Sequence, residues 1–230
     1  MIGILAGMGP KSTGPFIDKV VAQCEKQYGA KDDLDFPHMM IYSCPTPFYL
    51  DRPIIHDELK ASIIEGARRL QGCGVDFIGI PCNTAHLYIA DIQKNVSVPV
   101  INMIQQTIDC IPNSASKVAL LATEATVQSG IYQEALVEAG LEYINTDDWQ
   151  EKVTAIIRHI KIGETMEAGE KWQTLSKLLL HENVEAVIIA CTDLNVVTDG
   201  SQPPFKIVDS STCLAKAIVE KYLLNKKERR

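Results

Sequence analysis

The sequence predicts an α/β protein built on parallel sheets and composed of two similar halves. Short apolar runs rich in β-branched residues alternate with longer segments of helical period, which is typical of parallel α/β architecture. The order of these elements also repeats along the chain. With 230 residues and 46% hydrophobic composition, the chain can bury a substantial core. This length suits one large domain or two of about 100 residues each.

The apolar runs and the segments between them predict the following elements in order. Strands are expected near residues 2–6, 38–43, 76–81, 99–102, 117–122, 141–145, 186–190 and 206–209. Helices are expected near residues 13–28, 57–73, 84–95, 103–111, 125–139, 149–162, 166–182 and 210–224. A Ser-Thr signal opens the first helix, and Asp57 is expected to cap the second.

Similar stretches recur in the two halves of the chain. "IGILAGMGPKST" near the start resembles "VALLATEATVQS" at 118–129. Each apolar run that ends in a cysteine is followed by a short strand, "VPVIN" or "FKIVD". We therefore expect each half to supply four parallel strands, with its cysteine at the carboxyl end of the third.

The repeat divides the chain into two α/β domains. The first is predicted to span residues 1–102, and the second residues 103–208. The C-terminal helix, within 209–230, is predicted to pack back on the first domain, which would make that domain discontinuous.

Two cysteines lie where a buried strand should end, in "FIGIPCNTAH" (77–86) and "AVIIACTDLN" (186–195). Ligands bind at the carboxyl ends of parallel strands, so Cys82 and Cys191 would line one cleft if the halves face each other. A cysteine leading into a helix N-terminus favours the thiolate. A carbon acid between a thiolate and a thiol could lose a proton to one side and regain it from the other. The product would be its mirror image.

Composition and cysteine spacing exclude several other classes. The formal net charge of −7 argues against binding to nucleic acid or to an anionic membrane. The N-terminus lacks the features of a signal peptide, and no apolar run reaches the roughly 18 residues of a spanning helix. A cytoplasmic protein with reduced thiols is expected. Because the sequence has no CxxC pair, neither a metal site nor a redox dithiol is predicted.

Four motifs carry a resemblance to a known family: "ILAGMGPKST", "IPCNTAH", "ATEATVQSGIY" and "ACTDL". In this order and spacing they resemble the aspartate/glutamate racemase family, most closely its aspartate racemase branch, over nearly the whole chain. The resemblance implies two pseudo-symmetric domains of flavodoxin-like or Rossmann-like type, with the active site in the cleft between them. It also implies independence from pyridoxal phosphate and metals, a homodimer, and catalysis by two facing cysteines, here Cys82 and Cys191.

The resemblance further implies a set of substrate-binding residues. Arg52 in "YLDRP" and Lys161 in "HIKIG" match positions that govern the substrate carboxylates, and guanidinium and ammonium groups suit that role. The segments expected to surround the substrate contribute Met8, Gly9, Asn83, Thr84, Thr123 and Thr192. Asp193 stands where many aspartate racemases have Glu and glutamate racemases usually have His. It is expected to orient Cys191 or the substrate ammonium.

The expected reaction is the interconversion of L- and D-aspartate, with glutamate as a further substrate, and the expected partner is this small amino-acid dicarboxylate. Three alternatives stay open: a related enzyme such as a maleate isomerase, a Cys82–His86 hydrolase, and a non-catalytic binder of dicarboxylates. For His86, local packing or capping is favoured over pairing with the thiol. "GMGPKSTG" fails both phosphate-loop patterns, because Pro10 and Ser12 stand where glycines are needed.

Overall fold

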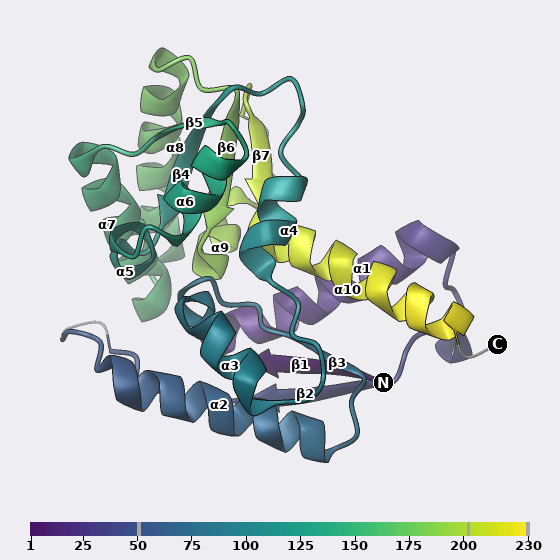
Figure 1. The fold of residues 1–230 in the computed structure, drawn as a ribbon. Coiled ribbons are helices and arrows are strands. Elements are labelled where there is room, and N and C mark those ends of the chain that lie inside the picture. The colour runs from purple at the N-terminus through teal and green to yellow at the C-terminus, as the bar shows by residue number, and fades with distance from the viewer. Residues whose placement is uncertain (50–51, 202, 229–230) are drawn as a thin grey trace. The chain divides into compact units, whose positions relative to one another are not determined.

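The computed structural model describes residues 1–49, 52–201 and 203–228. The chain divides into two compact units. The first unit consists of Met1–Met103 and Ser211–Arg230, and the second of Ile104–Ser210. Each unit contains a parallel sheet with helices packed on it (Figure 1).

The sheet of the first unit has the strand order β2-β1-β3 among the described residues. Its strands are β1 (Ile2–Ala6), β2 (Met39–Ser43) and β3 (Phe77–Gly79). Its helices are α1 (Thr13–Tyr28), α2 (His56–Gly72), α3 (Ile89–Asn95) and most of α10 (Ser210–Glu228). Short 3₁₀ segments are η1 (Pro10–Ser12), η2 (Asp33–Asp35) and η3 (Thr84–Tyr88).

Helices cover both faces of this sheet, as the continuous apolar character of β1 requires. On one face, Ile2 and Ile4 pack with buried side chains of α1 and α10, such as Val20 and Ile218. On the other face, Leu5 packs with buried side chains of α2, η3 and α3. Figure 1 shows α1 and α10 on one side of the strands and α2 and α3 on the other. The helices thereby bury β1 and β3, whereas β2 keeps exposed side chains such as Met40 and Ile41.

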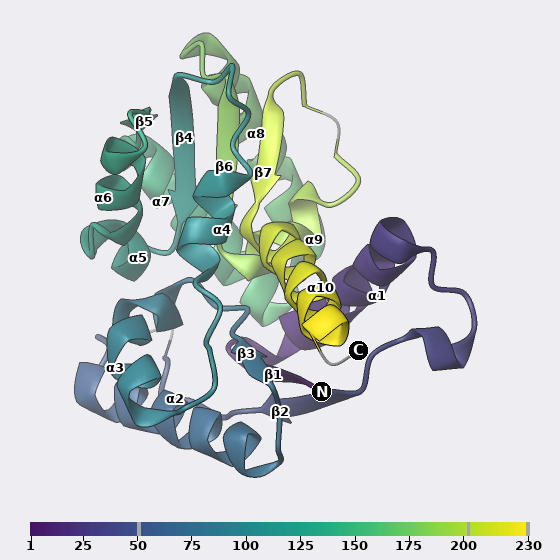
Figure 2. The same ribbon diagram turned by 45° about the vertical axis from the view of Figure 1, so that its right-hand side comes forward.

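The sheet of the second unit has the order β5-β4-β6-β7 among the described residues. Its strands are β4 (Lys117–Ala122), β5 (Glu142–Ile144), β6 (Ala186–Ala190) and β7 (Lys206–Asp209). Figure 2 shows β4, β6 and β7 side by side. Its helices are α4 (Met103–Asp109), α5 (Glu124–Gln128), α6 (Ile131–Glu138), α7 (Asp147–Ile162), α8 (Thr165–His181) and α9 (Asn195–Thr198), with a 3₁₀ segment η4 (Thr192–Leu194).

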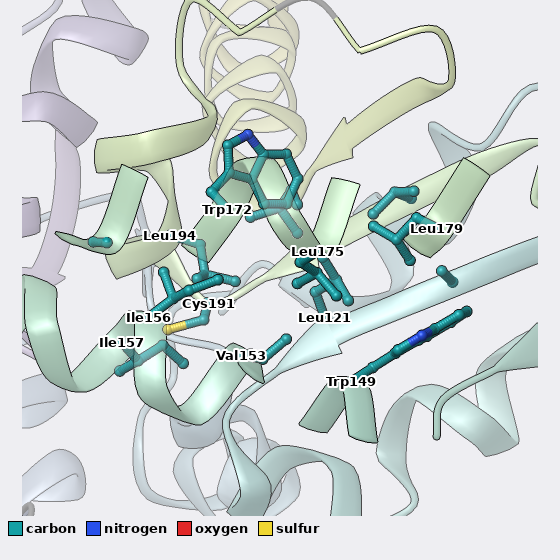
Figure 3. Close-up of a cluster of buried hydrophobic side chains, with 14 of the residues drawn as sticks. Leu121, Trp149, Val153, Ile156, Ile157, Trp172, Leu175, Leu179, Cys191 and Leu194 are labelled. Carbon is teal, nitrogen blue, oxygen red and sulfur yellow. The ribbon is translucent and has the colours of Figure 1, made fainter. Parts of the chain in front are cut away.

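The main core of the second unit lies between its sheet and the helix pair α7 and α8. Leu121 of β4 packs there with Trp149 and Val153 of α7 and with Trp172 and Leu175 of α8 (Figure 3). Buried residues of α7 recur at helical spacing, which gives the helix one apolar face. Cys191 lies at the margin of the same cluster.

The expected strand at 99–102 is wrong. Only one isolated bridge forms there, between Ile78 and Val100. The amide of Ile78 donates to the carbonyl of Pro99, and the amide of Ile101 donates to the carbonyl of Ile78, both at 2.9 Å. Pro99 has no N–H to extend the pairing. The described first sheet therefore has three strands where four were expected.

Two expected helices are each divided, and one expected cap is displaced. The segment 84–95 begins as η3 and becomes α3 only at Ile89. The segment 125–139 breaks at Gly130, which has a left-handed φ of 75° and separates α5 from α6. Asp57 lies in the first turn of α2, because Ile55 occupies the N-cap. There its carboxylate still favours the helix N-terminus.

A helix that spans a bilayer needs about 20 consecutive, predominantly apolar residues. Within residues 1–49, 52–201 and 203–228, no helix is both long and apolar enough to cross a membrane.

Candidate active site

In the second unit, Thr123 and Cys191 lie at the same edge of the sheet. Strands β4 and β6 are neighbours in parallel, with Ala122 paired to Ala190, and the two residues come directly after this pair. Thr123 is the N-cap of α5, and its hydroxyl accepts from the amide of Thr126 at 3.3 Å. Cys191 has an extended backbone and leads into η4. The sequence therefore places a thiol and a hydroxyl together at the carboxyl edge, where α/β proteins bind ligands.

Cys191 is buried among apolar neighbours. The residue is 7% exposed and belongs to the core cluster of the second unit. Its sulfur points toward Ile156 and Ile157 of α7 (Figure 3). The polar residues that follow it, Thr192 and Asp193, begin η4. The thiol thus lies at the boundary between a packed core and a polar turn.

Lys161 and Asp193 form an ion pair beside Cys191. Lys161 Nζ lies 2.8 Å from Asp193 Oδ2, and the two side chains are only 21% and 10% exposed. Lys161 belongs to the last turn of α7, where the helix dipole favours a cation. Helix α7 and segment η4 therefore bring together two residues that are expected to bind the substrate. Charge pairs shielded from water interact more strongly than those on the surface.

In the first unit, Met8, Gly9 and Cys82 follow adjacent strands. Ile4 pairs with Gly79, so the residues beyond β1 and beyond β3 emerge at the same edge of that sheet. Met8 and Cys82 are both partly buried against the cluster formed with α2, η3 and α3. This edge therefore also presents a thiol, one that is less buried than Cys191.

Gly7 lets the chain turn tightly after β1. Its φ is +93°, and a Cβ there would lie 2.6 Å from the backbone nitrogen of Cys44. Its amide donates to Thr13 Oγ1 at 3.2 Å. Only glycine fits this close approach without strain, so the path of Met8 and Gly9 depends on it.

His86 supports the main chain of Cys82. The side chain is 1% exposed. The amide of Met103 donates to Nε2 at 3.0 Å, so Nδ1 carries the proton and donates to the carbonyl of Cys82 at 2.8 Å. Burial lowers the pKa of His86, although its backbone contacts with Cys82 and Ile101 oppose this. A neutral imidazole thus fixes the backbone beside the thiol, as the favoured reading of local packing predicts.

The remaining predicted residues of the first unit differ in exposure. Asn83 and Thr84 are buried, at 3% and 6% exposure, and begin the turn after Cys82. Arg52 is exposed, and its guanidinium carbon lies 4.0 Å from the centre of the Tyr49 ring. Leu50 and Asp51 of the "YLDRP" motif lie outside the described residues.

The predicted residues fall into two groups, one on each unit. The first unit carries Met8, Gly9, Arg52, Cys82, Asn83 and Thr84. The second unit carries Thr123, Lys161, Cys191, Thr192 and Asp193. Within the part of the chain that the structure describes, no three His, Cys, Asp or Glu side chains gather in a way that could hold a metal ion.

Sequence reasoning did not single out Tyr88 and His56. The hydroxyl of Tyr88 lies 2.7 Å from Nδ1 of His56, and the two rings meet edge to face. Burial, then the charges of Asp57 and Cys82, raises the pKa of Tyr88. The available signal was a tyrosine shortly after the cysteine in "CNTAHLY".

Comparison with known proteins identifies the family. Residues 5–218 match the Asp/Glu/hydantoin racemase family. The chain belongs to this family. The racemase is therefore an isomerase, and the resemblance read from its motifs is confirmed.

Several relatives are similar to this racemase over nearly its whole length. The broad specificity amino-acid racemase RacX of Bacillus subtilis (strain 168) is 54% identical over 224 residues, covering 97% of this chain and 98% of that protein. The aspartate racemase of Picrophilus torridus has a TM-score of 0.82 at 30% identity, covering 96% of this chain and 93% of that one. An aspartate racemase homologue from Pyrococcus horikoshii has a TM-score of 0.75 at 26% identity, covering 96% and 97%. These matches and the two parallel sheets confirm the predicted α/β fold class.

Proposed function

We propose that this racemase inverts free amino acids at Cα by proton transfer between two cysteines, Cys82 and Cys191, without a cofactor. One observation carries the proposal: each unit places a cysteine just beyond a buried strand, at the carboxyl edge of a parallel sheet. The mechanism requires that both sulfurs reach one substrate from opposite sides.

The proposed reaction conserves protons in each turnover. One thiolate removes the Cα proton and becomes a thiol, leaving an enolate-like carbanion stabilised by hydrogen bonds to the carboxylate. The opposite thiol then donates its proton to the other face and becomes a thiolate. The two sulfurs have exchanged protonation states, so the product form of the enzyme is ready for the reverse reaction. Buried Asn83 and Thr84 supply amide and hydroxyl groups suited to the carboxylate.

For the substrate, we propose a range of amino acids that includes aspartate. The sequence motifs favour aspartate, and the similar solved structure from Picrophilus torridus is an aspartate racemase. The relative from Bacillus subtilis, at higher identity, is a broad specificity enzyme. In this proposal, Arg52 and Lys161 contact substrate carboxylates, and Met8, Gly9, Thr123 and Thr192 line the site.

The test follows solvent hydrogen into the product. The protein is incubated in deuterated water, with a chelator and without added cofactor, with single L-amino acids: aspartate, glutamate, alanine, lysine and arginine. Chiral chromatography with mass detection should find the D-enantiomer carrying one deuterium at Cα. The proposal would be overturned if none of these amino acids exchanged its Cα hydrogen for solvent deuterium. Conversion of maleate to fumarate in a parallel reaction, without amino-acid exchange, would replace it with an isomerase of another kind.

Two further properties implied by the family resemblance are also proposed for this chain. The homodimer is tested by light scattering of the purified protein, which should give twice the chain mass of 25.4 kDa. The cytoplasmic location is tested by cell fractionation.

A further inference from the structure

The carboxylate of Asp193 pairs with Lys161, the cation that is expected to select the second carboxylate of the substrate. Its two members come from separate elements, the end of α7 and the turn η4, and their charged atoms are 2.8 Å apart. Both side chains are largely shielded from solvent. By contrast, the Lys152–Asp148 pair lies within α7 itself, and the side chain of Asp148 is 62% exposed. The pair beside Cys191 is thus a built feature of the site.

We propose that Asp193 is a specificity-determining residue, because it cancels the charge of Lys161 where the substrate side chain is received. This inference rests on the proposed racemase function and deepens it by naming the substrate class. A subsite in which Asp193 balances the charge of Lys161 admits amino acids with neutral and basic side chains as well as acidic ones.

The physical reason is the short range of a paired charge. A lone ammonium in a shielded site attracts a second carboxylate strongly and opposes a second cation. With a carboxylate 2.8 Å away, the two fields largely cancel beyond the pair. An acidic side chain must then compete with Asp193 for Lys161, whereas a neutral one leaves the pair intact. A basic side chain can share the carboxylate of Asp193.

A purely structural role is the rival account. The pair could act only by tying α7 to η4 and so fixing Cys191. In that case, breaking it would slow the reaction of every amino acid by the same factor. Charge cancellation instead changes the ratio between substrates, and it acts mainly through KM, because the side-chain charge is the same in the ground and transition states.

The experiment measures the ratio of kcat/KM for L-aspartate to that for L-lysine. Asp193→Asn should raise this ratio about tenfold or more, because Lys161 becomes unopposed. Lys161→Gln should lower it by a similar factor, because Asp193 becomes unopposed. The double variant should return to within about threefold of the parent ratio, since its pair is again neutral. Lys161→Arg, which keeps the charge, should preserve the ratio.

A matched control separates this local effect from net charge. Asp148→Asn removes one negative charge from the exposed pair on α7 and should leave the ratio within about twofold of the parent value. Single variants of Lys161 and Asp193 that slow both substrates equally, with an unchanged ratio, would overturn the inference in favour of the structural role.

Binding measurements keep the inference testable if the parent protein racemises nothing. Calorimetry would then give dissociation constants for L-aspartate and L-lysine with the same variants. Opposite shifts of their ratio in Asp193→Asn and Lys161→Gln would support charge selection even though the proposed racemisation had failed. An unchanged ratio, or no binding of either amino acid, would overturn the inference as well.

Discussion

Cys82 is partly exposed and has its carbonyl fixed by a buried neutral histidine, whereas Cys191 is 7% exposed and is followed by an acid paired with Lys161. Both sulfurs come just after a strand of a parallel sheet. Both halves of the chain therefore place a cysteine sulfur shortly after a strand, but different residues surround it. The two cysteines therefore stand in unequal surroundings, with a buried histidine beside Cys82 and the Lys161–Asp193 ion pair beside Cys191.

The backbone conformations directly after β1 and directly after β4 also differ. Gly7 follows β1 with a φ of +93° and no room for a Cβ, while Thr123 follows β4 with a φ of −62° and caps a helix. The first turn depends on the absence of a side chain and the second on the presence of one. Equivalent positions in the repeat are thus held by different forces.

Loss of either cysteine is expected to have the largest effect. Cys82→Ala and Cys191→Ala should each lower racemisation about 10³-fold or more, because each direction needs both a proton acceptor and a donor. Initial rates with each enantiomer measure the loss. Cys73→Ala, at an exposed position after α2, serves as the control and should keep the parent rate. Full racemisation by either active-site variant would remove that cysteine from the mechanism.

Gly7→Ala should destabilise the protein by about 2–4 kcal/mol, because the new Cβ meets backbone atoms of Cys44 in a conformation that already disfavours it. Urea unfolding measures the change. Gly29→Ala is the matched control, since Gly29 has a φ of +73° and open space around its missing Cβ. That variant should lose only about 1 kcal/mol. Equal losses in the two variants would show that the contact with Cys44 contributes nothing.

His86 should make stability depend on pH. Burial lowers the pKa of His86 in the folded protein below the ordinary 6.5. At pH values between this lowered pKa and 6.5, the unfolded chain therefore binds a proton that the folded protein does not. Stability should be full above about pH 6.5 and should fall as the pH drops below it, by at most about 1.4 kcal/mol per pH unit. Urea unfolding across pH 5–8 measures this slope. His86→Gln should reduce it, and an unchanged slope in that variant would assign the effect to other groups.

Thr123→Ala should cost about 1 kcal/mol of stability through the lost cap of α5. Thr146→Ala removes the corresponding cap of α7 and should cost about the same. If Thr123 also contacts substrate, only its variant should raise KM. A rise of KM in both variants, or in neither, would limit Thr123 to its capping role.

Short apolar runs predicted the strands whose pairing is regular. The ranges 117–122, 186–190 and 206–209 agree with β4, β6 and β7, because each is a short apolar or β-branched run bounded by polar or turn residues. The strand expected at 99–102 was wrong because the apolar pattern does not show that Pro99 lacks the N–H needed for strand pairing. The division at Gly130 was missed because a single glycine is tolerated within a helical pattern.

The contacts of the site were less predictable than its residues. The motifs supplied both cysteines, Lys161 and Asp193, but the ion pair depends on how α7 packs against η4, and no local spacing encodes that. The same holds for His56 and Tyr88, whose side chains meet only after α2 and η3 pack together. Tertiary contacts between distant segments were therefore beyond the reach of the sequence patterns.

Solvent exchange at Cα by single-cysteine variants tests the two-base claim most directly. Each variant retains one sulfur, which can remove a proton only from the enantiomer whose Cα–H faces it and can return a solvent deuteron to the same side. In deuterated water, Cys82→Ala and Cys191→Ala should therefore label opposite enantiomers of aspartate without inverting them. Labelling of the same enantiomer by both variants, or of both enantiomers by either one, would contradict the account.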